Sequence, residues 1–208
     1  MIKVITSIAF VLCSLIASAQ QFEQGMGKAM ELWQQGKTTE ASAMFERIAA
    51  AEPNQWLPNY YVALVNTTTA FDPSQKAQVP ALLEKAQTAL DKELIKNDSN
   101  SELLVLQALI NTAYIVYDPM TNGMLLSDKV RQLYTKALVL DPKNPRVVAG
   151  KAEFEIGGAK YFGTDTKPMC AEIDRAVELF ATFKPETKFH PNWGSDRALE
   201  AQKECGKK

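Results

Sequence analysis

A repeat of about 44 residues runs through most of this chain and constrains its fold more than any other feature. Four helical segments end at equivalent points, marked by Pro53, Asp98, Pro142 and Pro185, which are 45, 44 and 43 residues apart. Before each end, a small or β-branched residue is followed four positions later by an apolar one. The four pairs are Ala41 and Phe45, Ala86 and Leu90, Val130 and Tyr134, and Ile173 and Val177. Residues four apart share one face of a helix, so the repeat predicts stacked helices.

A second recurring position supports a stack of helix pairs. The helix before each of these segments carries an alanine in the same place, at Ala29, Ala63, Ala108 and Ala152. A small residue lets two helix backbones approach closely. No stretch alternates apolar and polar residues as a strand would, so we expect an all-α fold.

Two of the segments resemble the second helix of a tetratricopeptide repeat. Residues 36–54 carry the Gly36, Ala41, Phe45 and Pro53 of that pattern, and residues 133–145 carry Tyr134 and "ALVLDP". The resemblance covers about 160 residues, is strongest in the first and third units, and leaves the register of the second in question at Glu93. It implies a TPR-like helical-hairpin solenoid of about four helix pairs plus a C-terminal capping helix.

Units two to four are longer than the family repeat, and the surplus lies between the two helices of each pair. There the chain reads "FDPSQKAQVP", "YDPMTNGMLLS" and "YFGTDTKP". Asp-Pro ends a helix, because proline disfavours helical geometry in the residue before it. We expect the aromatic residue before each break to pack the end of the first helix, and the three insertions to line one edge of the stack.

The first nineteen residues predict a removable export signal. Lys3 is followed by an uncharged apolar run and then by Ala17-Ser18-Ala19, so cleavage is expected before Gln20. An ordinary buried N-terminal helix is the alternative. Residues 20–208 then form one TPR-like domain. The tail motif "HPNWG" resembles exported repeat proteins of Gram-negative bacteria, which implies a periplasmic location.

Two cysteines remain after cleavage, Cys170 and Cys205. An even pair in an exported chain can form a disulfide. If the helices that carry them are antiparallel neighbours, the bond would pin the terminal helix. Two free, buried thiols are the alternative.

No catalytic or metal-binding constellation is found in the sequence. The one histidine, His190, lies in a turn, and it cannot supply a zinc or iron site with two distant cysteines. The glycine pairs lack phosphate-binding spacing. Acidic and basic residues nearly balance, at 24 and 23, so there is no basic stripe for nucleic acid. We therefore expect a protein that is not an enzyme and needs no cofactor.

The resemblance places partner binding in a concave groove lined by the first helix of each pair. By register, its candidate residues are Met30, Trp33, Tyr60, Tyr61, Leu64 and Leu109. Tyrosine and tryptophan suit binding surfaces, since they give amphipathic contact area. The alternatives are that these side chains pack between helices or that the tail fills the groove.

Two functions from different classes follow. The first is a non-catalytic exported scaffold that binds an unknown protein or peptide through the concave surface. The second is a small-molecule-binding helical accessory protein of an envelope transport system, in which long inter-helix segments enclose the ligand. A closed apolar cavity would favour the second, and an open polar groove the first.

Overall fold

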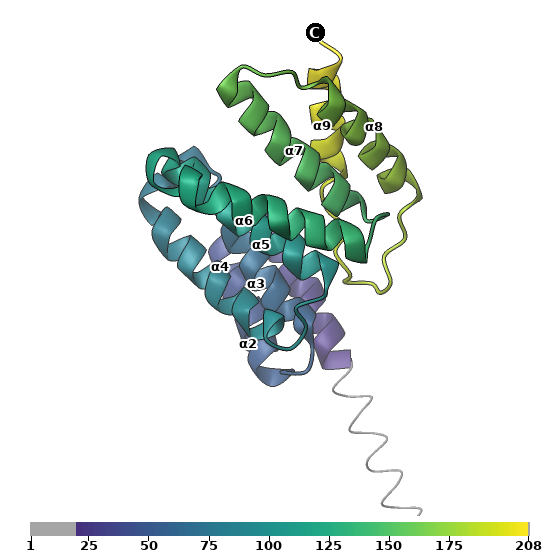
Figure 1. Ribbon diagram of the computed structural model, residues 1–208. Coiled ribbons are helices and arrows are strands. Elements are labelled where there is room, and N and C mark those ends of the chain that lie inside the picture. The colour runs from purple at the N-terminus through teal and green to yellow at the C-terminus, as the bar shows by residue number, and fades with distance from the viewer. Residues whose placement is uncertain (1–19, 208) are drawn as a thin grey trace, which may run out of the picture.

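A computed structural model of the protein describes residues 20–207, and all the regular structure in that range is helical (Figure 1). The first helix occupies residues 20–34 of the described range. The elements after it, in chain order, are α2 (Thr38–Ala51), α3 (Trp56–Ala70), the short 3₁₀ helix η1 (Pro73–Gln78), α4 (Val79–Leu94), α5 (Ser101–Tyr117), α6 (Pro119–Leu140), α7 (Pro145–Phe162), α8 (Lys167–Thr182) and α9 (Ser195–Cys205).

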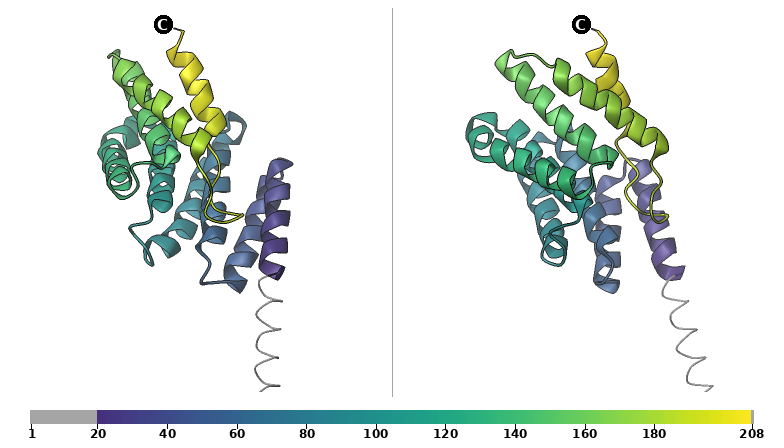
Figure 2. Two further views of the ribbon diagram at one scale, coloured as in Figure 1. Left: turned by 90° about the vertical axis from the view of Figure 1, so that its right-hand side faces the viewer. Right: turned by 45° about the vertical axis from the view of Figure 1, so that its right-hand side comes forward.

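These helices form four successive pairs, followed by α9, as the repeat predicts. The pairs are residues 20–34 with α2, α3 with α4, α5 with α6, and α7 with α8 (Figures 1 and 2). The all-α class predicted from the sequence is confirmed.

The predicted register is visible in the burial of the repeat positions. Ala41, Ala86, Val130 and Ile173 all have 0% exposure, although they lie in four different helices. The alanines of the first helices, at positions 29, 63, 108 and 152, are at most 1% exposed. Glu93, which breaks the pattern in unit two, is buried, and it accepts a hydrogen bond from Asn59 and pairs with Lys96.

An asparagine caps the first helix of the pair in units three and four. The side chain of Asn100 accepts hydrogen bonds from the backbone N–H groups of Glu102 and Leu103, and Asn144 accepts one from Arg146. These caps satisfy donors that the first turn of a helix leaves free. These two asparagines therefore determine where α5 and α7 begin.

The insertions between paired helices gather on one side of the stack, at the upper left of Figure 1. In unit two, most of the insertion between α3 and α4 lies outside the α-helices, and it contains the 3₁₀ helix η1. In unit three, Asp118 caps α6 through the Thr121 N–H, Pro119 takes the first helical position, and the extra residues become additional turns of α6. The predicted break at Asp118-Pro119 is therefore present, but it is a single residue long, because proline also fits the first position of a helix.

The segment after α8 folds back along the concave side before the chain enters α9, as both views in Figure 2 show. This tail, residues 183–194, contacts the start of α3 and the start of α7. Helix α9 follows Gly194, which has a φ of 99°, and the side chain of Ser195 makes no capping hydrogen bond. The terminal helix packs against α8, as a cap on the last pair would.

A disulfide joins Cys170 at the start of α8 to Cys205 at the end of α9, with their Cα atoms 5.8 Å apart. The predicted pairing is therefore confirmed. The bond closes a loop with a sequence separation of 35 residues, which contains the whole tail.

We expect the Cys170→Ser/Cys205→Ser double variant to lose roughly 3–4 kcal/mol of unfolding free energy, because the open chain gains loop entropy on unfolding. Urea unfolding of the oxidised protein and the variant measures the difference. Equal midpoints would contradict the expectation. The reduced wild-type protein is the control, and it should behave like the double variant.

Residues 1–19, where the sequence predicts an export signal, lie outside the described residues. Among the helices in residues 20–207, none combines the length and the apolar character needed to cross a membrane.

Candidate functional site

The concave surface predicted to bind a partner is covered by the protein's own tail. The hydroxyl of Tyr61 donates a hydrogen bond of 2.9 Å to the carbonyl oxygen of Phe189. The indole N–H of Trp193 donates one of 2.7 Å to the hydroxyl of Tyr60. His190 lies between Trp56 and Phe183, with ring centroids 6.1 and 6.2 Å away. The tail thus occupies the place where a bound peptide was expected.

The structure brings the six predicted groove residues together, but as one packed cluster. Tyr60, Tyr61, Leu64 and Leu109 belong to the main core, with exposures of 0%, 3%, 0% and 9%. Met30 and Trp33 are partly buried against the same core, and the Trp33 ring meets the edge of Tyr61 at 6.1 Å. Burial raises the pKa of both tyrosines well above the ordinary value. A ligand would reach Tyr60 and Tyr61 only after displacing the tail that is hydrogen-bonded to them.

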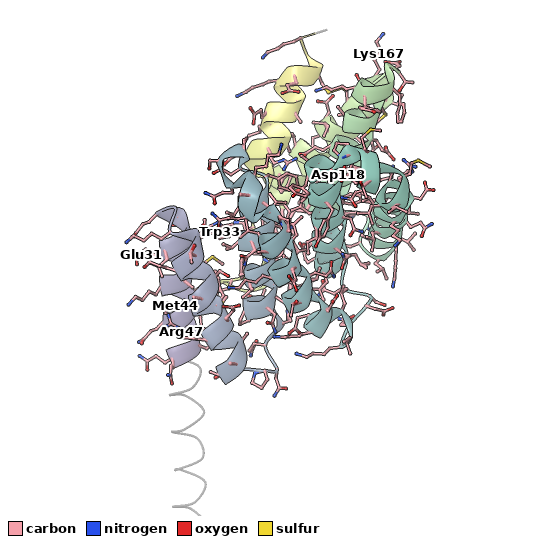
Figure 3. The ribbon with its side chains drawn as sticks, turned by 90° about the vertical axis from the view of Figure 1, so that its left-hand side faces the viewer. Glu31, Trp33, Met44, Arg47, Asp118 and Lys167 are labelled. Carbon is pink, nitrogen blue, oxygen red and sulfur yellow. A yellow bond between two sulfur atoms is a disulfide. The ribbon has the colours of Figure 1, made fainter. Side chains whose placement is uncertain are left out.

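Large apolar side chains are instead exposed at the turns of the last two helix pairs. We call this set the apolar edge, and it comprises Val116, Tyr117, Met120, Met124, Leu125, Tyr161 and Phe162. Their exposures range from 41% for Tyr117 to 93% for Met124. Figure 1 shows that the α5–α6 turn and the end of α7 lie on the same side of the stack. In Figure 3 the labelled Asp118, beside the α5–α6 turn, lies away from Trp33 and also from Lys167, which begins α8.

The apolar edge lies at helix ends because Asp118 begins α6 and Gly163 ends α7. Asp118 lies between Tyr117 and the start of α6, and hydrogen bonds from Thr121 hold the pKa of its carboxyl below the ordinary value. Helix α7 ends at Gly163, whose φ of 68° favours glycine. Tyr161 and Phe162 directly precede this turn, and their rings meet edge to face with centroids 5.0 Å apart. Both rings therefore project from a defined helix end.

Sequence reasoning missed the apolar edge. It expected the aromatic residue before each helix break to pack inward. Phe71 does pack against the core, but Tyr161 is 74% exposed and Tyr117 is 41% exposed. The signal was present as two methionines and two adjacent aromatics in segments read as turns, where polar residues are the usual choice.

A surface groove of about 830 Å³ lies between α2 and α4 and offers a different environment. Alanines and charged side chains line it, none of its lining residues is aromatic, and the exposed ion pair of Glu46 and Lys85 joins its two walls. In the described part of the chain, no group of three or more His, Cys, Asp or Glu residues is arranged to hold a metal ion.

Comparison with solved structures finds a protein of similar fold. No protein-family model matches the chain. No curated protein matches it either. Among solved structures, the HusA haemophore from Porphyromonas gingivalis superposes with a TM-score of 0.77 and 23% sequence identity, over 88% of this chain and 91% of the haemophore. At that identity the likeness shows a shared fold: this chain has the all-helical fold of that haemophore.

Proposed function

We propose that this protein is an exported, non-catalytic carrier that binds a small, flat, largely apolar molecule of the porphyrin class at the apolar edge. The observation that carries the proposal is the exposure of methionine and aromatic side chains at the α5–α6 turn and at the end of α7, on the same side of the stack (Figure 1). Exposed apolar patches on a folded protein commonly mark binding surfaces. The shared fold with a protein named as a haemophore supports this choice of ligand class.

The chemistry of the apolar edge suits a carbon-rich macrocycle. The rings of Tyr161 and Phe162 are perpendicular, so one of them can stack on a face of a flat ligand while the other meets the ligand with its edge. Met120 and Met124 are flexible and polarisable, so they adapt to its outline. Since the edge is open to solvent, carboxylate groups on the rim of a porphyrin can stay hydrated while its faces are covered.

Iron ligation by histidine is not available at the apolar edge. His190 lies in the tail, its side chain is 13% exposed, and its ring is flanked by Trp56 and Phe183. Tyr161, Tyr117 and the two methionines carry atoms that bind haem iron in other proteins. Ring stacking needs no iron, so haem and metal-free protoporphyrin are both informative ligands.

The tail argues against a scaffold that binds partners through the concave surface. A partner there would have to break the hydrogen bonds of Tyr61 and Trp193 and expose the core beneath them. The open apolar edge requires no such rearrangement. We therefore prefer the small-molecule carrier.

We further propose that the helix pairs are TPR-like repeats and that the protein works in the periplasm of a Gram-negative bacterium. The TPR-like residues of units one and three and the regular burial of the repeat positions support the first point. The signal-like first nineteen residues and the disulfide support export.

The test is a fluorescence-quenching titration with haem and with protoporphyrin IX. The Tyr161→Ala/Phe162→Ala variant should bind both at least tenfold more weakly, because burying one aromatic side chain contributes about 1.5–3 kcal/mol. Its melting temperature should change little, since both rings are exposed.

The matched control is Ile95→Ala/Val139→Ala, which removes two exposed apolar side chains that lie outside the apolar edge. This variant should bind like the wild type. Equal affinities for all three proteins would overturn the proposal.

A further inference from the structure

Helix α9 is attached to the rest of the protein by few non-covalent contacts. It has 11 residues, all in the described range, and of these only Ala198 is buried. An isolated helix of that length is marginal in water. Its ion pairs with α7 use the side chains of Arg197 and Glu204, which are 58% and 56% exposed, and such exposed pairs contribute little. The disulfide is therefore the main link that keeps α9 in place.

The tail that leads into α9 lies over the aromatic surface at the start of α3 (Figure 2). Phe189 is 8% exposed, and its carbonyl oxygen accepts the hydrogen bond from Tyr61. Trp193, which bonds to Tyr60, lies just before Ser195, where α9 begins. A displaced α9 would therefore remove the fixed end that holds Trp193 against α3.

The disulfide closes the tail and α9 into a ring. Cys170 lies at the start of α8 and Cys205 at the end of α9, so the chain between positions 170 and 205 is held at both ends. With the bond intact, α9 gains little freedom by leaving its place, because its last turn stays attached to α8. With the bond reduced, α9 becomes a free chain end, and local opening is easiest at such ends.

The disulfide is accessible to a reductant. Cys170 and Cys205 are both partly exposed. Both also line an open cleft of about 410 Å³ between α7, α8 and α9. Exposed disulfides are more readily reduced than buried structural ones and are more often regulatory. A thiol can therefore approach the bond from this cleft.

We infer that the disulfide, α9 and the tail form a redox-controlled strap, which covers the concave surface when the bond is oxidised and uncovers it when a dithiol reduces the bond. A thiolate of the dithiol attacks one cysteine sulfur, the S–S bond breaks, and the other cysteine leaves as a thiolate that takes up a proton. The second thiol of the reductant then displaces the first cysteine and forms the reductant's own disulfide. Two electrons and two protons thus pass to the protein.

Opening the strap exposes Tyr60 and Tyr61, the two tyrosines that the sequence predicts as partner-binding residues. Both hydroxyls lose their hydrogen-bond partners in the tail and become available to another molecule. The concave surface is then open under reducing conditions and closed under oxidising ones. The strap does not depend on the proposed porphyrin carrier, because no residue of the apolar edge belongs to the tail or to α9.

The experiment compares ¹H–¹⁵N NMR spectra of the oxidised wild-type protein and the Cys170→Ser/Cys205→Ser variant. In the variant, the amide signals of residues 195–205 should lose their helical shifts, and the indole N–H of Trp193 should move to the position of a solvent-exposed indole. The soluble spin label 4-hydroxy-TEMPO should broaden the amide signals of residues 56–61 in the variant and spare them in the oxidised protein. The signals of α4 and α5 should keep their positions, because these helices lie outside the ring.

Glu204→Ala is the matched control, because it removes an exposed ion pair of α9 next to the disulfide and leaves the bond intact. Its spectrum should change only near the substitution. Wild-type protein reduced with dithiothreitol should match the double variant and return to the oxidised spectrum on reoxidation. Unchanged α9 and Trp193 signals after reduction would overturn the inference. So would a loss of dispersion throughout the spectrum, since the bond would then stabilise the whole domain and not a strap.

Discussion

Replacing Glu102 by alanine is expected to lower the unfolding free energy by about 3–5 kcal/mol, because it leaves a charged guanidinium buried without its partner. Arg146 and Glu102 lie at equivalent positions of neighbouring repeat units, 44 residues apart, and their side chains are 0% and 3% exposed. The Asn144 amide also donates a 2.6 Å hydrogen bond to Glu102 and would lose it. Urea unfolding monitored by circular dichroism measures the loss.

Two further variants give this prediction its controls. Glu172→Ala breaks the exposed pair with Arg175 and should cost less than about 1 kcal/mol. The double variant Glu102→Met/Arg146→Met removes both buried charges and should recover much of the stability that Glu102→Ala loses. A Glu102→Ala protein as stable as Glu172→Ala would show that the buried pair is not what joins units three and four.

The second large effect is expected at Tyr60. Its side chain has 0% exposure, it contacts the edges of Trp56 and Tyr61, and its hydroxyl accepts a hydrogen bond from Trp193. Tyr60→Ala should cost roughly 3–5 kcal/mol, as truncation of a buried aromatic does. The tail should detach at the same time, because Trp193 loses its acceptor. Thermal melts measure the first effect, and the indole N–H signal of Trp193 reports the second.

Tyr161→Ala is the comparison for this variant, since it also removes a tyrosine ring, but from the exposed edge. It should change the stability by less than about 0.5 kcal/mol. If Tyr60→Ala melted like Tyr161→Ala and weakened ligand binding more, the concave groove and not the apolar edge would be the binding surface.

The repeat could be predicted from the sequence because it depends on spacing alone. An apolar or small residue at every equivalent position must face the neighbouring helices, whichever partner they have, and Ala41, Ala86, Val130 and Ile173 are all fully buried. The disulfide followed from the same logic, since the start of α8 and the end of α9 meet when these helices are antiparallel neighbours.

Features that depend on distant segments could not be predicted in this way. Tyr60 and Tyr61 have the composition of a binding surface, but residues 128 to 133 positions later cover them. Position in the repeat says which face a residue occupies, and it does not say what lies on that face. Likewise, "YDPM" reads as a break, and only the capped geometry of Asp118 shows that α6 begins there and carries Met120 and Met124 into solvent.

The most direct test of the small-molecule carrier is to map where a porphyrin binds. Haem is added to the ¹⁵N-labelled protein, and the paramagnetic iron broadens the amide signals near it. The account predicts that the signals of residues 116–125 and 161–163 are lost first, while those of the tail at 183–194 persist. Loss centred on the tail and the start of α3, or no selective loss at all, would contradict it.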